Sequence, residues 1–119
     1  MLEKNKEYEF SKVIEELKRI YTEQGIQVLY DDNNWCVYAQ KADINLDTLC
    51  YIDVYPDFTD DDDEILPEFI INNHCQLVYR DEMLQDIIIS ALGRKKDVTN
   101  EELMKAINYY ESNDTFLKI

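Results

Sequence analysis

The spacing of apolar residues predicts a helix in the first part of the chain. Between residues 13 and 21 they recur at intervals of three and four positions, which places one apolar stripe along a helix. The stripe consists of Val13, Ile14, Leu17, Ile20 and Tyr21. Gly25 follows, and glycine often ends helices because it takes the left-handed conformation without a steric penalty. We therefore expect a helix over residues 6–24.

Two more stripes of this kind predict helices near the end of the chain. One consists of Met83, Leu84, Ile87, Ile88, Ala91 and Leu92, and the other of Leu103, Ala106, Ile107 and Tyr110. Asp81 stands where the first of these helices needs an N-cap, and Gly93 stands where it ends. Thr99 and Glu102 have the spacing of a capping box, so the last helix is expected to begin directly after Thr99.

Between these helical stretches the apolar pattern changes to a period of two, which is typical of strands. Strands are predicted at residues 26–30, 35–39, 49–55 and 76–80, with a polar turn at 31–34 that makes the first two a hairpin. Pro56 ends the third strand, because proline has no N–H for the strand ladder. A short helix is expected to begin at Pro67, since the first turn of a helix tolerates proline.

The order of these elements, α-β-β-β-(short α)-β-α-α, predicts an α+β fold. We expect a mainly antiparallel four-stranded sheet with helices packed on one face. The 119 residues suffice for one domain, which we expect to span residues 1–119. An apolar fraction of 45% excludes an intrinsically disordered acidic chain.

Negative charge is concentrated in the middle of the chain. Residues 1–41 and 80–119 each carry eight acids and six bases, whereas residues 42–79 carry ten acids and no lysine or arginine. The three segments have net charges of −2, −10 and −2, which sum to −14. A field of one sign attracts partners of the opposite sign and repels polyanions. We therefore expect a basic protein as the partner, and neither nucleic acid nor an anionic membrane surface.

Targeting and cysteine patterns indicate a reduced, cytoplasmic protein. The first ten residues contain no apolar run of signal-peptide length, and no stretch approaches the roughly 20 apolar residues that span a bilayer. Cys36, Cys50 and Cys75 are odd in number and lie far apart in sequence. This spacing argues against a disulfide framework and against a zinc ribbon, so we expect buried thiols.

The sequence predicts no enzyme and no cofactor. Its one histidine, His74, adjoins Cys75, but neighbours on an extended chain point in opposite directions and make a poor catalytic dyad. The two glycines, Gly25 and Gly93, stand where helices end, which excludes a glycine-rich phosphate loop. No convergent set of catalytic residues is left, and no metal site is expected.

Weak binding of calcium by the acidic stretch is left open. Counted from Asp57, the residues Asp57, Thr59 and Asp61 fall at positions 1, 3 and 5 of an EF-hand loop, and Glu68 falls at position 12. Position 6, which needs glycine for its sharp turn, is Asp62. A true EF-hand is therefore excluded.

The acidic loop near residues 57–64 is the candidate binding surface. We expect the partner to contact Asp53, Tyr55, Asp57, Phe58, Asp60, Asp61, Asp62, Asp63 and Glu64, with Tyr51 as a further anchor. Aromatic side chains beside acids suit a basic protein, because the rings supply buried area while the carboxylates orient the partner and speed its association. Two alternatives stay open: a merely solvated loop, and tyrosines that belong to a second covered face of the sheet. Trp35 beside Asp31 and Asp32 is a second candidate patch, although a lone tryptophan is more often core.

The resemblance of this chain to a known class of proteins lies in the short acidic α+β build, the stretch YIDVYPDFTDDDDE and the helical ending TNEELMKAINYYESNDTF. In these features the chain resembles bacterial immunity proteins of polymorphic-toxin and contact-dependent growth inhibition systems. The resemblance implies a protein that binds and neutralises a cognate toxin domain in the producing cell. A nuclease toxin suits the negative charge of this chain, because carboxylates can stand where the phosphates of the nuclease's substrate would lie. The class is diverse in fold, so no residue is carried over from it. The alternative is a non-enzymatic adaptor or regulatory module for another basic protein, including a DNA mimic. The sequence predicts neither the partner's identity nor the oligomeric state.

Overall fold

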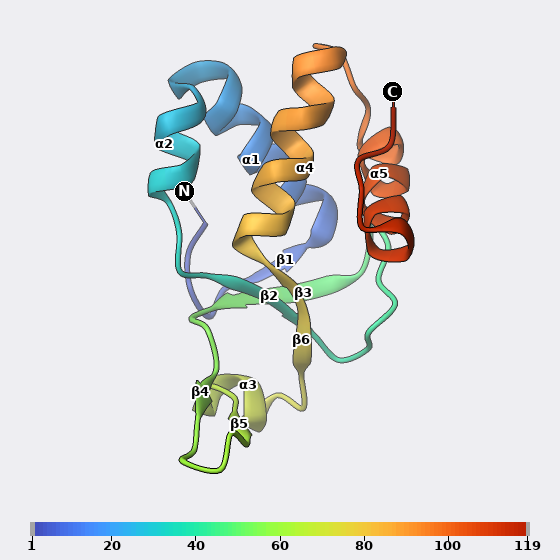
Figure 1. Cartoon of the computed structure of the whole chain (residues 1–119). Coiled ribbons are helices and arrows are strands. Elements are labelled where there is room, and N and C mark those ends of the chain that lie inside the picture. Colours follow the sequence, from blue (N-terminus) through green and yellow to red (C-terminus); the bar gives the residue numbers. More distant parts are fainter. Residues whose placement is uncertain (1, 119) are drawn as a thin grey trace.

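The structure is a computed structural model that describes residues 2–118. In this range the chain forms a four-stranded sheet with helices on both faces (Figure 1). The elements are β1 (Glu7–Glu9), α1 (Phe10–Gln24), α2 (Ile26–Asp31), β2 (Cys36–Ala39), β3 (Leu49–Asp53), β4 (Asp57–Phe58), β5 (Glu64–Ile65), α3 (Glu68–Asn72), β6 (Gln76–Arg80), α4 (Asp81–Arg94) and α5 (Asn100–Asn113). Helices α1, α2, α4 and α5 lie above the sheet, and α3 with the β4–β5 hairpin lies below it (Figure 1).

The sheet has the order β1-β3-β2-β6, and all its neighbouring strands are antiparallel. Tyr51 at its centre pairs with Glu7 on one side and with Tyr38 on the other. An irregularity in the β2–β6 pairing falls between Val37 and Tyr38. The predicted α+β class and the mainly antiparallel four-stranded sheet are confirmed.

The main core lies between the sheet and the helices above it. Its centre contains Phe10, Ile14, Leu17, Ile52, Leu84, Ile88, Leu103 and Ile107, each at most 1% exposed. The apolar stripes of α1, α4 and α5 thus point inward as predicted. Thr99 and Glu102 form the predicted capping box, in which the Thr99 hydroxyl accepts from the Glu102 amide and the Glu102 carboxylate accepts from the Thr99 amide.

A second, smaller core lies on the opposite face of the sheet. Cys36 and Tyr38 of β2 point to this face and pack with Ile70 of α3 and with Cys75. Tyr51 and Tyr55 pack against this cluster and are half-buried. Both tyrosines therefore pack on the second covered face of the sheet, which is one of the possibilities that the sequence left open.

Two predicted elements are wrong near the N-terminus. Residues 26–30 were expected to form a strand but belong to helix α2, where the Leu29 amide donates to the Gly25 carbonyl. Gly25 has φ of 93°, and this conformation lets the chain break after α1 and start a new helix at once. The fourth strand of the sheet is instead Glu7–Glu9, which was expected to be the first turn of α1.

No helix within residues 2–118 is long and apolar enough to span a membrane.

Candidate functional site: an acidic hairpin

The acidic stretch forms the tip of an ordered hairpin. In the β4–β5 pair, Asp57 stands opposite Ile65 and Phe58 opposite Glu64. The Thr59 amide donates to the Asp63 carbonyl at 2.9 Å, and the Asp62 amide donates to the Thr59 carbonyl at 2.9 Å. These bonds close a loop of three residues, a common hairpin connection that needs a left-handed residue in its last position.

Asp62 occupies that left-handed position with φ of 64°. Glycine is the usual residue there, but aspartate is among the few others that adopt this conformation readily. The Thr59 hydroxyl also accepts from the Asp63 amide at 3.1 Å. The four successive aspartates are therefore held in a defined turn, although sequence alone predicted only an acidic loop.

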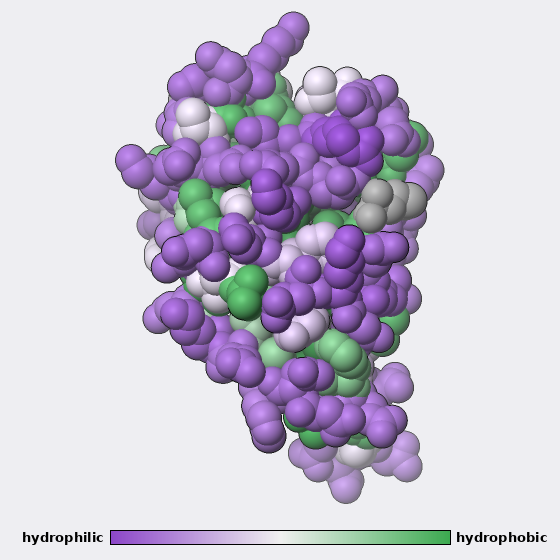
Figure 2. All heavy atoms as spheres, turned by 180° about the vertical axis from the view of Figure 1, so that it is seen from behind, coloured by the Kyte–Doolittle hydropathy of each residue, from purple (hydrophilic) through white to green (hydrophobic). Residues whose placement is uncertain are grey.

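Every side chain of the hairpin is exposed, including two large apolar ones. Phe58 is 56% exposed and Ile65 is 46% exposed. Because neighbouring strand residues alternate between faces, Phe58 and Ile65 point to opposite sides of the hairpin. From behind, the lower end of the molecule is mostly hydrophilic, with hydrophobic residues between the polar ones (Figure 2). The ion pairs within residues 2–118 all lie elsewhere, so none of the bases in this range forms an ion pair with the hairpin.

Asp53 lies apart from this exposed group. It is 7% exposed, its Oδ2 accepts from Asn5 Nδ2 at 2.6 Å, and its Oδ1 accepts from the Val54 amide at 2.8 Å. Its carboxylate ties the end of β3 to the segment before β1. Asp53 is therefore a buried group whose carboxylate is hydrogen-bonded within the chain.

Tyr55 is likewise engaged inside the molecule. Its hydroxyl donates to Asp81 Oδ1, and the Arg80 guanidinium lies 5.2 Å from the centre of its ring. Burial and the hydrogen bond to Asp81 raise the pKa of Tyr55. The ring packs against the smaller core and presents only part of its surface to solvent.

Asp81 is the centre of a buried network that the sequence did not reveal. It is 1% exposed, and its Oδ2 accepts from the amides of Asn34 at 2.6 Å and Trp35 at 3.3 Å. Its Oδ1 accepts from the Tyr55 hydroxyl and from the Glu82 amide. Asp81 was expected to be the N-cap of its helix, but it is the first helical residue and the N-cap is Arg80.

The second candidate patch, around Trp35, is core. Trp35 is 2% exposed, and its indole Nε1 donates to the Asp32 carbonyl at 2.8 Å. Burial is the main reason why the pKa of the Asp32 carboxyl is raised. Asp31 is exposed and bonded to Gln27 within α2. Trp35 itself is therefore a core residue.

His74 and Cys75 lie between α3 and β6. Cys75 is 7% exposed, and burial raises the pKa of its thiol, which disfavours the nucleophilic thiolate. Within residues 2–118, no three His, Cys, Asp or Glu side chains are grouped so that they could hold a metal ion.

A family model for a domain of unknown function, DUF7716, matches residues 14–119. The chain belongs to the DUF7716 family. The matched range contains the whole hairpin, most of α1, the helices α2 to α5 and every strand of the sheet except β1. No curated protein and no solved structure matches the chain.

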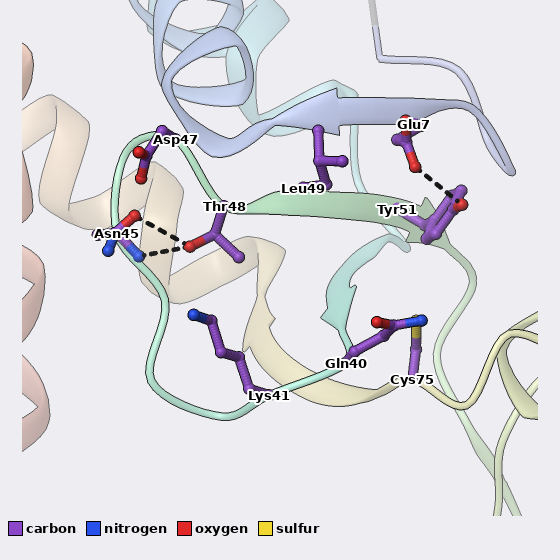
Figure 3. A pocket seen from close by; sticks show the side chains of 9 residues that line it. All are labelled: Glu7, Gln40, Lys41, Asn45, Asp47, Thr48, Leu49, Tyr51 and Cys75. Carbon is purple, nitrogen blue, oxygen red and sulfur yellow. Dashed lines mark hydrogen bonds between the residues drawn. The ribbon is translucent and has the colours of Figure 1, made fainter.

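A surface hollow on the lower face of the sheet is a second feature that the sequence did not reveal. It has a volume of about 650 Å³. It is lined by Glu7, Gln40, Lys41, Asn45, Asp47, Thr48, Leu49, Tyr51 and Cys75 (Figure 3). Of these, all but Glu7 lie within the range matched by the DUF7716 model. The alternating pattern of residues 49–55 placed Leu49 and Tyr51 on one face, but nothing in it indicated that this face is left partly open.

Proposed function

We propose that this protein is a cytoplasmic, non-enzymatic inhibitor that binds and neutralises a basic toxin domain through the β4–β5 hairpin. The observation that carries the proposal is the ordered, projecting hairpin, whose six carboxylates form no ion pair with a base in residues 2–118. The contact residues are Asp57, Phe58, Asp60, Asp61, Asp62, Asp63, Glu64 and Ile65. Asp53 and Tyr55, whose polar groups are engaged internally, are left out of this set.

The order of the hairpin matters for affinity. A flexible acidic loop would lose conformational freedom when it binds, whereas the hydrogen bonds of Thr59 already fix the turn in the free protein. Phe58 and Ile65 add apolar area beside the charges, which is the composition of a protein interface. The charges then act mainly on the rate of association and on the choice of partner.

A nuclease toxin suits this surface best. An enzyme that cleaves nucleic acid carries a positive field where it binds phosphates, and a compact group of carboxylates occupies the same field. This inhibition needs no catalysis by the inhibitor. It also agrees with the resemblance of the chain to bacterial immunity proteins.

The test is an affinity capture from the native bacterial lysate at low salt, followed by a salt gradient and mass spectrometry. The bait is the wild-type protein or a variant in which Asp60, Asp61, Asp62 and Asp63 are all changed to Asn. Asparagine also tolerates the left-handed conformation of position 62, so the turn is expected to persist. A matched control changes four exposed acids elsewhere to their amides: Glu3, Glu23, Asp43 and Asp97.

We expect the wild type and the control to retain one basic toxin-domain protein that the hairpin variant releases at lower salt. With the purified partner, the hairpin variant should associate at least about tenfold more slowly at low salt and show a flatter salt dependence. An equal association rate for all three baits would show that the hairpin is not part of the interface. Capture of a DNA-binding protein instead of a toxin would favour the alternative of a DNA mimic.

A further inference from the structure

The lower face of the sheet is covered over only part of its area. Tyr51 in β3 packs edge-on against Phe69 of α3, with ring centres 5.1 Å apart. Leu49, two residues earlier on the same strand and face, is 53% exposed although β3 is an inner strand of the sheet. Helix α3 therefore covers this face only as far as Tyr51. Leu49 is left uncovered and forms the apolar floor of the hollow (Figure 3).

The charges around this floor are arranged unevenly. Glu7 lies at one end, where its Oε2 is held by the Tyr51 hydroxyl at 3.1 Å. Lys41 lies at the opposite end, on the side of Asn45 and Asp47 (Figure 3). Among the residues that line the hollow, Glu7 is the acid that lies beside Tyr51, and it lies away from Lys41.

We infer that this hollow binds a lysine or arginine side chain of the basic partner. Such a side chain has an aliphatic stem and a cationic head, which match the exposed Leu49 and the Glu7 carboxylate beside the Tyr51 ring. The head lies at the Glu7 end, away from Lys41. The inference rests on the proposed function for the identity of the partner, but the hollow is tested without that partner.

The position of the hollow supports a shared interface. Both the hollow and the β4–β5 hairpin lie on the side of the sheet away from α1, α2, α4 and α5 (Figures 1 and 3). A partner that approaches this side meets the hairpin first as the projecting element. One basic side chain inserted into the hollow then fixes its orientation.

The test is a titration of the ¹⁵N-labelled protein with three capped tripeptides at constant ionic strength, followed by amide chemical shifts. The probes are acetyl-Gly-Arg-Gly-amide, acetyl-Gly-Lys-Gly-amide and, as a neutral probe, acetyl-Gly-Gln-Gly-amide. The variants are Glu7→Gln, which still offers an oxygen to the Tyr51 hydroxyl, and Asp61→Asn, which makes the same charge change on the hairpin.

We expect the two cationic peptides to shift the amides of Thr48, Leu49 and Tyr51, and the neutral peptide to leave them unmoved. Glu7→Gln should weaken this binding about two- to fivefold, the effect of losing one exposed ion pair, while Asp61→Asn leaves it unchanged. Shifts confined to the hairpin, or equal shifts with the neutral peptide, would overturn the inference. Shifts at Leu49 that depend on protein concentration without peptide would overturn it in favour of a second copy of the chain. None of these outcomes depends on the lysate capture, so the two proposals fail separately.

Discussion

Asp81→Asn is the substitution that tests the described network most sharply. The change keeps the size of the side chain but replaces one acceptor oxygen by an NH₂ group. In the wild type both oxygens accept two hydrogen bonds each, from Asn34, Trp35, Tyr55 and Glu82. The new NH₂ group faces donors wherever it is placed.

The least costly arrangement turns the amide nitrogen toward Tyr55, because a hydroxyl can also accept a hydrogen bond. The Glu82 amide then loses its partner, and the two remaining bonds, to the amides of Asn34 and Trp35, lose the benefit of a charged acceptor. A hydrogen bond to a charged group contributes about 1.5–3 kcal/mol, and an unpaired buried donor costs about 1–3 kcal/mol. We therefore expect Asp81→Asn to lower the free energy of unfolding by roughly 2–4 kcal/mol, out of roughly 6–18 kcal/mol for a domain of this length.

Urea unfolding followed by the fluorescence of Trp35 measures this loss, since Trp35 is the one tryptophan of the chain and contacts the network directly. Tyr55→Phe removes one donor and should cost less, about 1–2 kcal/mol. Asp43→Asn, the same charge change at an exposed site, should stay within about 0.5 kcal/mol of the wild type. A loss below about 1 kcal/mol for Asp81→Asn would refute the four-bond network.

Two further predictions concern the helices. Ile88→Ala, at a site 1% exposed, should lower the free energy of unfolding by about 2–5 kcal/mol in urea unfolding, clearly more than Ile89→Ala at its half-buried neighbour. Lys95 and the capping-box bond hold the pKa of Glu102 below its usual 4.5, so its charge stabilises the folded state above that pH and this contribution is lost as the pH falls through the lowered value. The stability difference between the wild type and Glu102→Gln, which keeps the capping geometry, should therefore be present at neutral pH and vanish in acid; a difference independent of pH would contradict this.

The long helices were predictable because each has a stripe that spans several turns. Over such a length the helical period of apolar positions cannot be mistaken for the period of a strand. Residues 26–31 are too short for this distinction, since Ile26, Val28 and Tyr30 alternate as in a strand while helix α2 buries Leu29 fully. β1 was missed for a related reason, because three residues with two glutamates carry almost no pattern.

The candidate site could be located from charge but not resolved into its parts. The run of aspartates indicated an acidic segment but no hairpin. Asp62 stands where a hairpin loop of this type usually has glycine, so the sequence lacked the residue that would have indicated a turn. The hydrogen bonds of Asp53 and Tyr55 could not be predicted from the sequence either. Their partners, Asn5 and Asp81, lie 48 and 26 residues away in sequence, and such pairs follow from the fold alone.

Under the proposed function, the internal bonds around residues 53–55 would affect recognition although these residues lie outside the proposed contact surface. The chain leaves the sheet here and enters β4 two residues after Tyr55. Asp53 is bound by Asn5, the Val54 carbonyl accepts from the Tyr38 hydroxyl at 2.6 Å, and Tyr55 is bound to Asp81. The base of the hairpin is thus fixed on successive residues, and its other end continues into α3, which Ile70 anchors in the smaller core. A hairpin held in this way presents its charges in one direction, so a substitution at Tyr55 should change partner affinity through orientation even though its polar group faces inward.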